Sequence, residues 1–158
     1  MATNPQPMFF LNLPVKDLGK ATTFYEGLGY SKNTQFSDEN ASSMVISDTI
    51  VVMLLAEPFF KTFTTKGIAD TSTSTEALLG LSAETREAVD TLVDKALATG
   101  GSEGNATQDH GFMYSRSFQD PDGHIWEIIW MNPENIEAER PNFLGERRNP
   151  ANTRSVEW

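Results

Sequence analysis

The chain has 158 residues, which is enough for one domain or for two very small modules that share a core. Its 22 acidic and 12 basic side chains give a net charge of −10, so nucleic acid and anionic membrane surfaces are not expected as partners. It has no cysteine, which excludes disulfides, zinc fingers and thiol nucleophiles and suits a reducing compartment.

The first part of the chain predicts a β-α-β-β-β series. Residues 8–15 carry apolar side chains at every second position, which is typical of a strand. Asp17 is suited to cap the start of a helix, and Gly29 to end it, because glycine reaches the left-handed conformation without strain. The predicted elements are a strand at 8–15, a helix at 18–28 and strands at 30–35, 41–47 and 50–55, which together make residues 1–56 the first module.

Residues 57–75 interrupt the pattern. They hold Phe59, Phe60 and Phe63 in a stretch that is otherwise polar and rich in threonine. Loops of this length are usually functional or mobile. Two interpretations stay open, a plain linker with its phenylalanines against the core and a lid over a site.

The same series then starts again in residues 76–131, the second module. The segments around Asp17 and Thr85 correspond at an offset of 68 residues, so the chain is a repeat of two halves with one core. Residues 132–158 contain three prolines and little periodicity, so we expect a loosely attached tail. The predicted elements of the second module are a strand at 76–82, a helix at 84–99, a polar stretch at 102–111, a strand at 112–118, a turn at 120–123 and a strand at 124–131.

No targeting or membrane segment is expected. Residues 1–7 hold neither a basic residue nor a long apolar stretch. The longest apolar run, residues 50–56, is far shorter than the about 20 residues of a transmembrane helix. The sequence therefore predicts a soluble, cytoplasmic protein.

The turn at 120–123 and the strand after it contain the strongest local signal. Asp120-Pro121-Asp122-Gly123 has the residues that a tight turn requires. In the strand that follows, Glu127 lies between Ile125 and Ile129 on one face. A buried carboxylate is costly unless it is paired, hydrogen-bonded or bound to a metal. We therefore expect Glu127 to face a cavity; the alternative is a solvated or purely structural residue.

Together these segments resemble the vicinal oxygen chelate superfamily, which includes lactoylglutathione lyase (glyoxalase I), bleomycin-resistance proteins, fosfomycin-resistance enzymes and extradiol dioxygenases. The resemblance spans about residues 8–131 and implies an α+β fold. Two paired βαβββ modules would form a cup-shaped mixed sheet with helices on its outer face, in a protein that is commonly a homodimer. The residues that carry the resemblance are Leu13-Pro14-Val15-Lys16-Asp17-Leu18, Phe24-Tyr25, Leu28-Gly29-Tyr30 and the run from Asp120 to Glu127.

The resemblance also implies a metal site. Family enzymes hold a divalent metal with four inward-facing side chains on the first and last strands of each module, where it acts as a Lewis acid. The matching positions are Phe10, Met53, Leu78 and Glu127. Only Glu127 is a suitable ligand, and a catalytic site normally offers about three protein ligands. We therefore expect no complete metal site, and a divalent metal would rest on the resemblance alone.

Strand parity predicts which side chains line the cup. Because Arg116 and Glu127 are predicted to share the inner face, a polar organic ligand that carries a carboxylate is favoured. In an alternative interpretation, the apolar members of this set simply fill the interior. The predicted ligand-binding residues are Phe10, Asn12, Met53, Leu78, Ser82, Tyr114 and Arg116.

The two histidines receive different predictions. His124 is expected to cap or stack at the turn. His110 lies in the polar loop, where it is either a surface residue or a general base at the mouth of the cup, since histidine titrates near neutral pH.

Three functions follow from these observations. The favoured one is a dimeric, cytoplasmic protein that binds a small organic molecule in the cup, as bleomycin-resistance proteins do; the negative net charge suits a cationic ligand. The second is a metal-dependent lyase, isomerase or dioxygenase that resembles lactoylglutathione lyase, with Glu127 as one metal ligand and His110 or solvent as another. The third is a metal-free enzyme with Glu127 or His110 as the catalytic base.

Overall fold

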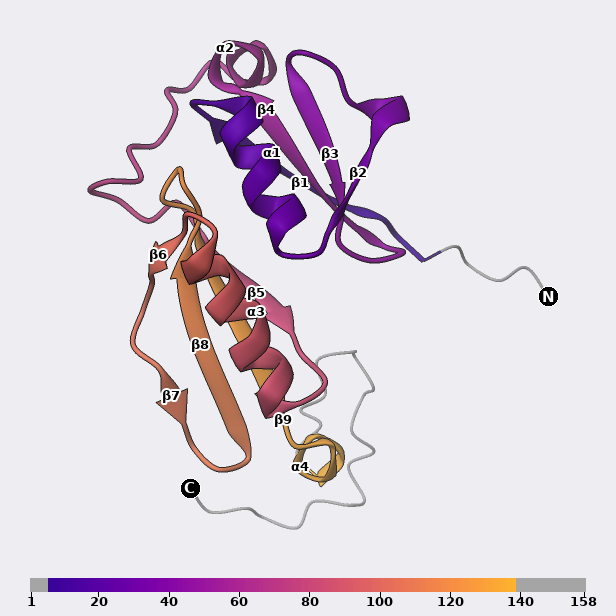
Figure 1. The fold of residues 1–158 in the computed structure, drawn as a ribbon, viewed down its shortest axis with the longest axis vertical. Helices are drawn as coiled ribbons and strands as arrows, with labels where there is room; N and C mark the ends of the chain where they lie inside the picture. The colour runs from indigo at the N-terminus through magenta and orange to yellow at the C-terminus, as the bar shows by residue number, and fades with distance from the viewer. Residues whose placement is uncertain (1–5, 139–158) are drawn as a thin grey trace, which may run out of the picture.

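The computed structural model describes residues 6–138 and contains two β-α-β-β-β units, each a mixed sheet with a helix on one face (Figure 1). In the first unit the strand order is β1-β4-β3-β2, and β1 runs parallel to β4 while the other neighbours are antiparallel. Its elements are β1 (Phe9–Val15), α1 (Leu18–Gly27), β2 (Ser31–Asn33), the 3-10 turn η1 (Thr34–Phe36), β3 (Ala41–Val45) and β4 (Ile50–Ala56).

The second unit repeats this arrangement. Its strand order is β5-β9-β8-β6, with β7 also paired to β8, and β5 runs parallel to β9. The predicted α+β class and the repeat are thus confirmed, as two open mixed sheets rather than a closed barrel. The elements are β5 (Leu78–Ser82), α3 (Arg86–Ala98), β6 (Ser102–Glu103), β7 (Gln108–Asp109), β8 (Met113–Gln119) and β9 (Ile125–Met131).

Short helical turns flank the second unit. After β4, the chain forms α2 (Glu57–Phe60) and the 3-10 turn η2 (Lys61–Phe63). Residues 64–77, called the strap below, then lead to β5 without a helix or strand. After β9, α4 (Pro133–Ala138) occupies a part of the chain that was expected to be an irregular tail. The rest of that predicted tail, residues 139–158, lies outside the described residues.

The boundaries of α1 follow from local chemistry. The Asp17 carboxylate accepts a hydrogen bond from the backbone N–H of Lys20 at 3.0 Å, as the predicted cap requires. At the other end Gly29 has a φ of 101°, a conformation that glycine adopts without a steric penalty.

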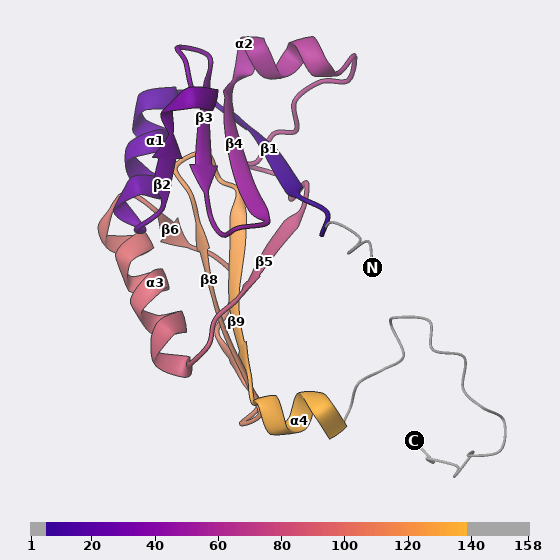
Figure 2. The ribbon, with the colours of Figure 1, turned by 90° about the vertical axis from the view of Figure 1, so that its right-hand side faces the viewer.

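One core joins the two units. Both α1 and α3 lie on the same side of the sheets (Figure 2), and buried side chains from both units form a single apolar cluster there. The ring of Phe24 on α1 lies 6.0 Å from that of Phe118 on β8, so the first helix packs directly on the second sheet. The largest members of the core are Phe24, Tyr25, Met44, Leu54, Phe118, Trp126 and Ile128.

Within residues 6–138, none of the helices has the length and apolar character that crossing a bilayer requires.

Candidate functional site

The face of each sheet that points away from α1 and α3, called the open face below, carries most of the predicted site. On β1, Leu13 and Val15 are buried in the core, so the alternate residues Phe10 and Asn12 point to the open face. Asn12 pairs with Met53 on β4, which places that side chain on the same face. Phe10 is 56% exposed, an unusual situation for an aromatic ring that lies on a sheet.

The second sheet contributes Glu127 to its own open face. Trp126 and Ile128 are buried on the helix side, so Glu127 between them points the other way. Leu78 and Ser82 on β5 share this orientation because they pair with Ile125 and Ile129 of β9. Leu78 is 55% exposed.

The Glu127 carboxylate has a hydrogen-bonding partner. Its Oε1 accepts a bond of 3.0 Å from the side-chain amide of Asn105, which lies between β6 and β7. Glu127 is half-buried and Asn105 is exposed. The amide holds one carboxylate oxygen in place and leaves Oε2 without a hydrogen bond from any described residue. Nothing in the polar stretch around Asn105 distinguished this residue in the sequence.

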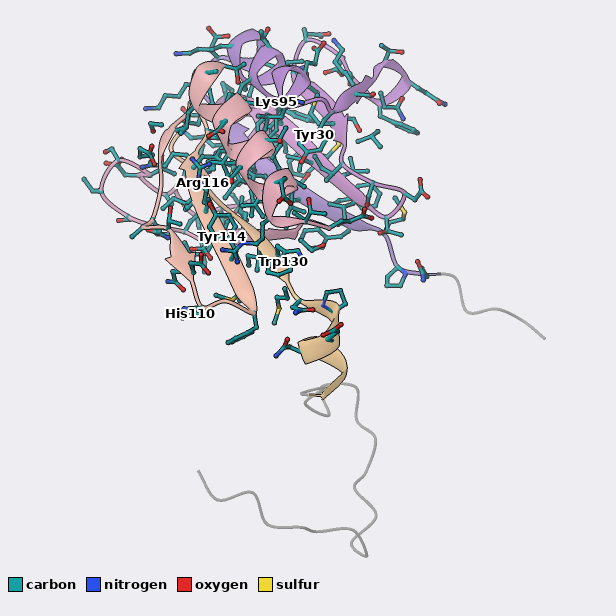
Figure 3. The ribbon with its side chains drawn as sticks, turned by 60° about the horizontal axis from the view of Figure 1, so that its bottom comes forward. Tyr30, Lys95, His110, Tyr114, Arg116 and Trp130 are labelled. Atoms are coloured by element: carbon teal, nitrogen blue, oxygen red, sulfur yellow. The ribbon has the colours of Figure 1, made fainter. Side chains whose placement is uncertain are left out.

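Tyr114 and Arg116 lie on the face of β8 that α3 covers (Figure 3). Glu127 points to the other face of the sheet, so the prediction that the three side chains line the cup together is wrong. Arg116 pairs with Ile128, and its Nη1 donates to Asp90 at 2.9 Å and Asp94 at 3.0 Å on α3. The Tyr114 hydroxyl donates to the same Asp90 carboxylate at 2.7 Å. These bonds join α3 to its sheet, and they lower the pKa of Asp90.

The wrong prediction for the faces of β8 is explained by the shape of the turn before β9. A turn that paired Asp120 with Gly123 would bring Arg116 opposite Glu127. Instead the backbone N–H of Asp120 donates to His124 O at 3.0 Å, and Gly123 forms a bulge with a φ of 82°. The extra residue shifts the register by one, which exchanges the two faces of β8. The open face therefore lacks the predicted arginine, and the argument for a carboxylate ligand loses its basis.

His110 is remote from Glu127. Its backbone N–H donates to Met113 O at 2.9 Å in the β7–β8 turn, and its ring is exposed and stacked on Phe112. Glu127 pairs with Ser117, which lies four residues beyond Met113 on β8. This separation corresponds to about 13 Å along the strand. The structure therefore does not bring the two proposed catalytic residues together.

His124, predicted to cap or stack at the turn, instead connects three segments. The ring is 1% exposed; Nδ1 lies 2.7 Å from Glu76 Oε1 in the strap, and Nε2 lies 2.8 Å from Pro14 O in β1. A carboxylate and a carbonyl only accept hydrogen bonds, so both ring nitrogens carry a proton when both bonds form. Burial lowers the pKa of His124, but the Asp120 charge and these two bonds outweigh it and raise the pKa above its ordinary value.

A second buried group joins α1 to the same turn. The Tyr25 hydroxyl donates to Asp120 Oδ2 at 2.6 Å and accepts from the indole N–H of Trp126 at 2.9 Å. Burial, above all, raises the pKa of both Asp120 and Tyr25. Sequence reasoning missed this network, because the partners lie 95 or more positions from Tyr25 and no local pattern relates them.

Comparison with known proteins agrees with this architecture. Residues 8–128 match the profile of the Glyoxalase/Bleomycin resistance protein/Dioxygenase superfamily. The chain belongs to this superfamily. No curated protein matches the sequence.

Several solved structures share the fold. Hypothetical protein SA1046 from S. aureus is 27% identical, with a TM-score of 0.67 over 81% of this chain and 95% of that one. A glyoxalase-related enzyme from Fulvimarina pelagi is 21% identical, with a TM-score of 0.67 over 80% of this chain and 88% of that one. The fosfomycin resistance protein FosX from Mesorhizobium loti is 15% identical, with a TM-score of 0.58 over 87% of this chain and 99% of that one. At these identities the last two show the fold alone.

The side chains at the superfamily's metal positions do not suit a divalent ion. Phe10 and Leu78 have no donor atom, and the Met53 thioether is a poor ligand for hard or borderline metals. Glu127 alone offers oxygen, and residues 6–138 contain no group of three or more histidine, aspartate or glutamate side chains placed to hold a metal. We therefore derive no chemistry from a metal at this position.

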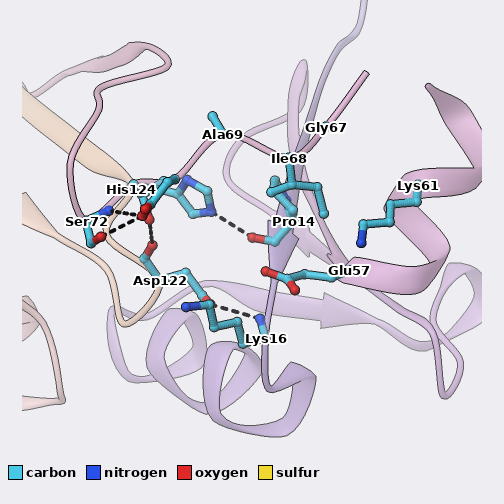
Figure 4. A pocket seen from close by; sticks show the side chains of 12 residues that line it. Pro14, Lys16, Glu57, Lys61, Gly67, Ile68, Ala69, Ser72, Asp122 and His124 are labelled. Atoms are coloured by element: carbon cyan, nitrogen blue, oxygen red, sulfur yellow. Dashed lines mark hydrogen bonds between the residues drawn. The ribbon is translucent and has the colours of Figure 1, made fainter. Parts of the chain in front are cut away.

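Two cavities lie beneath the strap. One, of about 470 Å³, is polar, and the other, of about 410 Å³, is lined mainly by apolar side chains. Figure 4 shows His124 in the wall of the larger cavity, and the same side chain also lines the apolar one. Of the predicted site residues, Asn12 lines the apolar cavity.

Proposed function

We propose that this protein binds a small organic cation on its open face and does so without a complete metal site. The observation that carries the proposal is the exposure of Phe10 on the open face of the first sheet and of Leu78 on the second sheet, where β5 pairs with the strand that presents Glu127. An aromatic face attracts a cation through the ring quadrupole, and apolar side chains shield the body of an organic ligand from water. The carboxylate supplies the compensating charge.

The charge of the site favours a cation over an anion. Among the predicted lining residues that point to the open face, Glu127 is the only one that carries charge, because Arg116 is paired with α3. The chain as a whole has a net charge of −10, which raises the local concentration of cations and repels anions. Asn105 supports this role by holding the Glu127 carboxylate oxygen in place.

The test is a screen of small aromatic amines, each beside its neutral amide analogue, followed by calorimetric titration of the strongest amine. Glu127→Gln keeps the shape of the side chain but removes its charge, so we expect a loss of affinity of about tenfold or more. Phe10→Ala is expected to weaken binding as well. The matched controls Glu103→Gln and Phe36→Ala change exposed residues on β6 and η1 and should leave the affinity unchanged.

A chelator distinguishes this function from the metal-dependent alternative. Binding that persists in EDTA, with equal affinity, supports the proposal. Binding that disappears in EDTA and returns with Ni²⁺, Zn²⁺, Mn²⁺ or Fe²⁺ would replace it with a lyase, isomerase or dioxygenase related to lactoylglutathione lyase. An amine and its amide that bind equally well would also refute the proposal, because the charge would then contribute nothing.

We further propose that the protein acts as a homodimer in the cytoplasm. The lack of cysteine suits a reducing compartment, and Met8 and Phe9, just before and at the start of β1, offer exposed apolar surface for a second copy. Light scattering of the purified protein gives its mass directly. A mass of one chain at micromolar concentration would contradict the dimer.

A further inference from the structure

We propose that the strap, residues 64–77, covers a second small-molecule site, which takes an apolar molecule with a single anionic group, such as an arylalkanoic acid. The site differs from the one proposed on the open face, although Asn12 borders both, and it has the opposite charge preference.

The cavity beneath the strap has the size and lining of a ligand site. Its volume of about 410 Å³ falls within the range of about 300–1,000 Å³ that is typical of small-molecule pockets. Its wall is formed by three leucines from the two edge strands, Leu11 and Leu13 on β1 and Leu79 on β5. Phe60 on α2 and Ile68 in the strap add further apolar surface. The cavity thus lies between the edge strands of the two sheets.

Two contacts attach the strap to the second unit. The Thr71 hydroxyl donates to the backbone carbonyl of Asp122, and the Glu76 carboxylate lies against the His124 ring. Both partners, Asp122 and His124, lie just before β9, in the turn that Asp120 anchors in the core. The strap therefore has a fixed position over the cavity rather than a free path across solvent.

The charges around the cavity select the ligand. Glu76, His124 and Lys66 are the ionisable side chains in its wall. The first two are paired with each other at 2.7 Å, so the carboxylate charge is compensated when His124 is protonated. Lys66 forms no ion pair with any residue between 6 and 138, which leaves its ammonium group as the available charge. An apolar body with one anionic end satisfies both the wall and this lysine.

The neighbouring polar cavity accommodates the hydrated end of such a ligand. It shares Pro14, Ile68 and His124 with the apolar one, and two further lysines, Lys16 and Lys61, line it. Glu57, Asp70 and Asp122 line it as well, and the two aspartates accept hydrogen bonds within the protein. Asp122 accepts from the Lys16 backbone N–H at 2.9 Å, and Asp70 accepts from Ser72.

The experiment uses two probes with the full chain. 8-Anilinonaphthalene-1-sulfonate, whose emission rises in apolar surroundings, reports binding by fluorescence, and 4-phenylbutyrate, by calorimetry, tests a carboxylate in place of a sulfonate. Lys66→Glu reverses the available charge, and we expect at least a tenfold weaker affinity for both probes. The matched control is Lys32→Glu, the same reversal at an exposed position on β2, which should change affinity by less than twofold. Far-UV circular dichroism confirms that each variant is folded.

Three further results decide the assignment. Ile68→Asn, which places an amide in the apolar wall, should also reduce binding about tenfold, and Glu127→Gln should leave probe affinity unchanged. Equal loss in Lys66→Glu and Lys32→Glu would show a general charge effect and overturn the proposal. A gain of affinity in Glu127→Gln would place the anionic probe on the open face, where the carboxylate repels it, and would also overturn the proposal without bearing on the cation screen described above.

Discussion

Replacement of His124 by phenylalanine is expected to lower the free energy of unfolding by about 3 kcal/mol. The hydrogen bond to Glu76 involves charge and is worth about 1.5–3 kcal/mol, and the carbonyl of Pro14 left without its donor costs about 1–3 kcal/mol. The Glu76 side chain is 26% exposed, so water replaces part of the lost interaction and the lower half of the combined range applies. Phenylalanine is somewhat larger than histidine, so the substitution leaves no cavity.

The same ring predicts a pH dependence with a definite sign. The pKa of His124 is raised in the folded protein above its ordinary value of 6.5, so the folded state binds the proton more tightly than the unfolded chain. The stabilisation is therefore complete below pH 6.5 and disappears as the pH rises through the folded-state pKa. Glu76 and Asp120 are the charged groups that face the ring and favour the proton.

The assay is urea unfolding followed by circular dichroism at several pH values from 6 to 9. The wild-type protein should lose stability over this interval, and His124→Phe should lose less. If His124→Phe fails to fold, Glu76→Gln serves in its place, since it removes the charge that favours the imidazolium, and its pH dependence should be shallower than that of the wild type. A cost below about 1 kcal/mol for His124→Phe, together with parallel pH profiles, would refute the assignment.

Two other substitutions test the placement of side chains. Arg116→Met should destabilise the protein by about 1 kcal/mol in thermal unfolding, a modest value because its α3 partners are largely exposed. The same variant should leave cation binding on the open face unchanged. Reduced cation affinity in a folded variant would mean that the guanidinium does reach the ligand. Tyr25→Phe should cost about 1.5–3 kcal/mol in urea unfolding, because the buried Asp120 carboxylate loses its hydroxyl donor, and a cost near zero would show that water replaces the hydroxyl.

Local patterns in the sequence were sufficient to predict the repeat and most element boundaries. The cap at Asp17 and the left-handed glycine at position 29 depend on neighbours within a few residues, and both appear as expected. The alternation of inward-facing and outward-facing side chains in β1 was equally predictable, because its apolar residues recur at every second position and pack under α1.

Properties that depend on register or on distant contacts were not predictable in the same way. The faces of β8 depend on one bulged residue, Gly123, and a shift of one position reverses every side chain of a strand. The partners of His124 lie 48 and 110 positions away along the chain, so no local signal showed that this histidine is buried. Asn105 lies in a polar loop where many residues have the same side-chain chemistry.

The contact between Tyr25 and Asp120 also means that the two halves of the repeat are not interchangeable. The position 68 residues after Tyr25 is Val93, which has no hydroxyl to offer the other half. The turn between β3 and β4, the counterpart of the one that holds Asp120, has the exposed Asp48 in place of a buried acceptor. A chain assembled from two copies of the first unit would supply a tyrosine donor at each helix but no buried carboxylate to receive it. Each half has thus become a specialised complement of the other, and recombination between them would separate donor from acceptor.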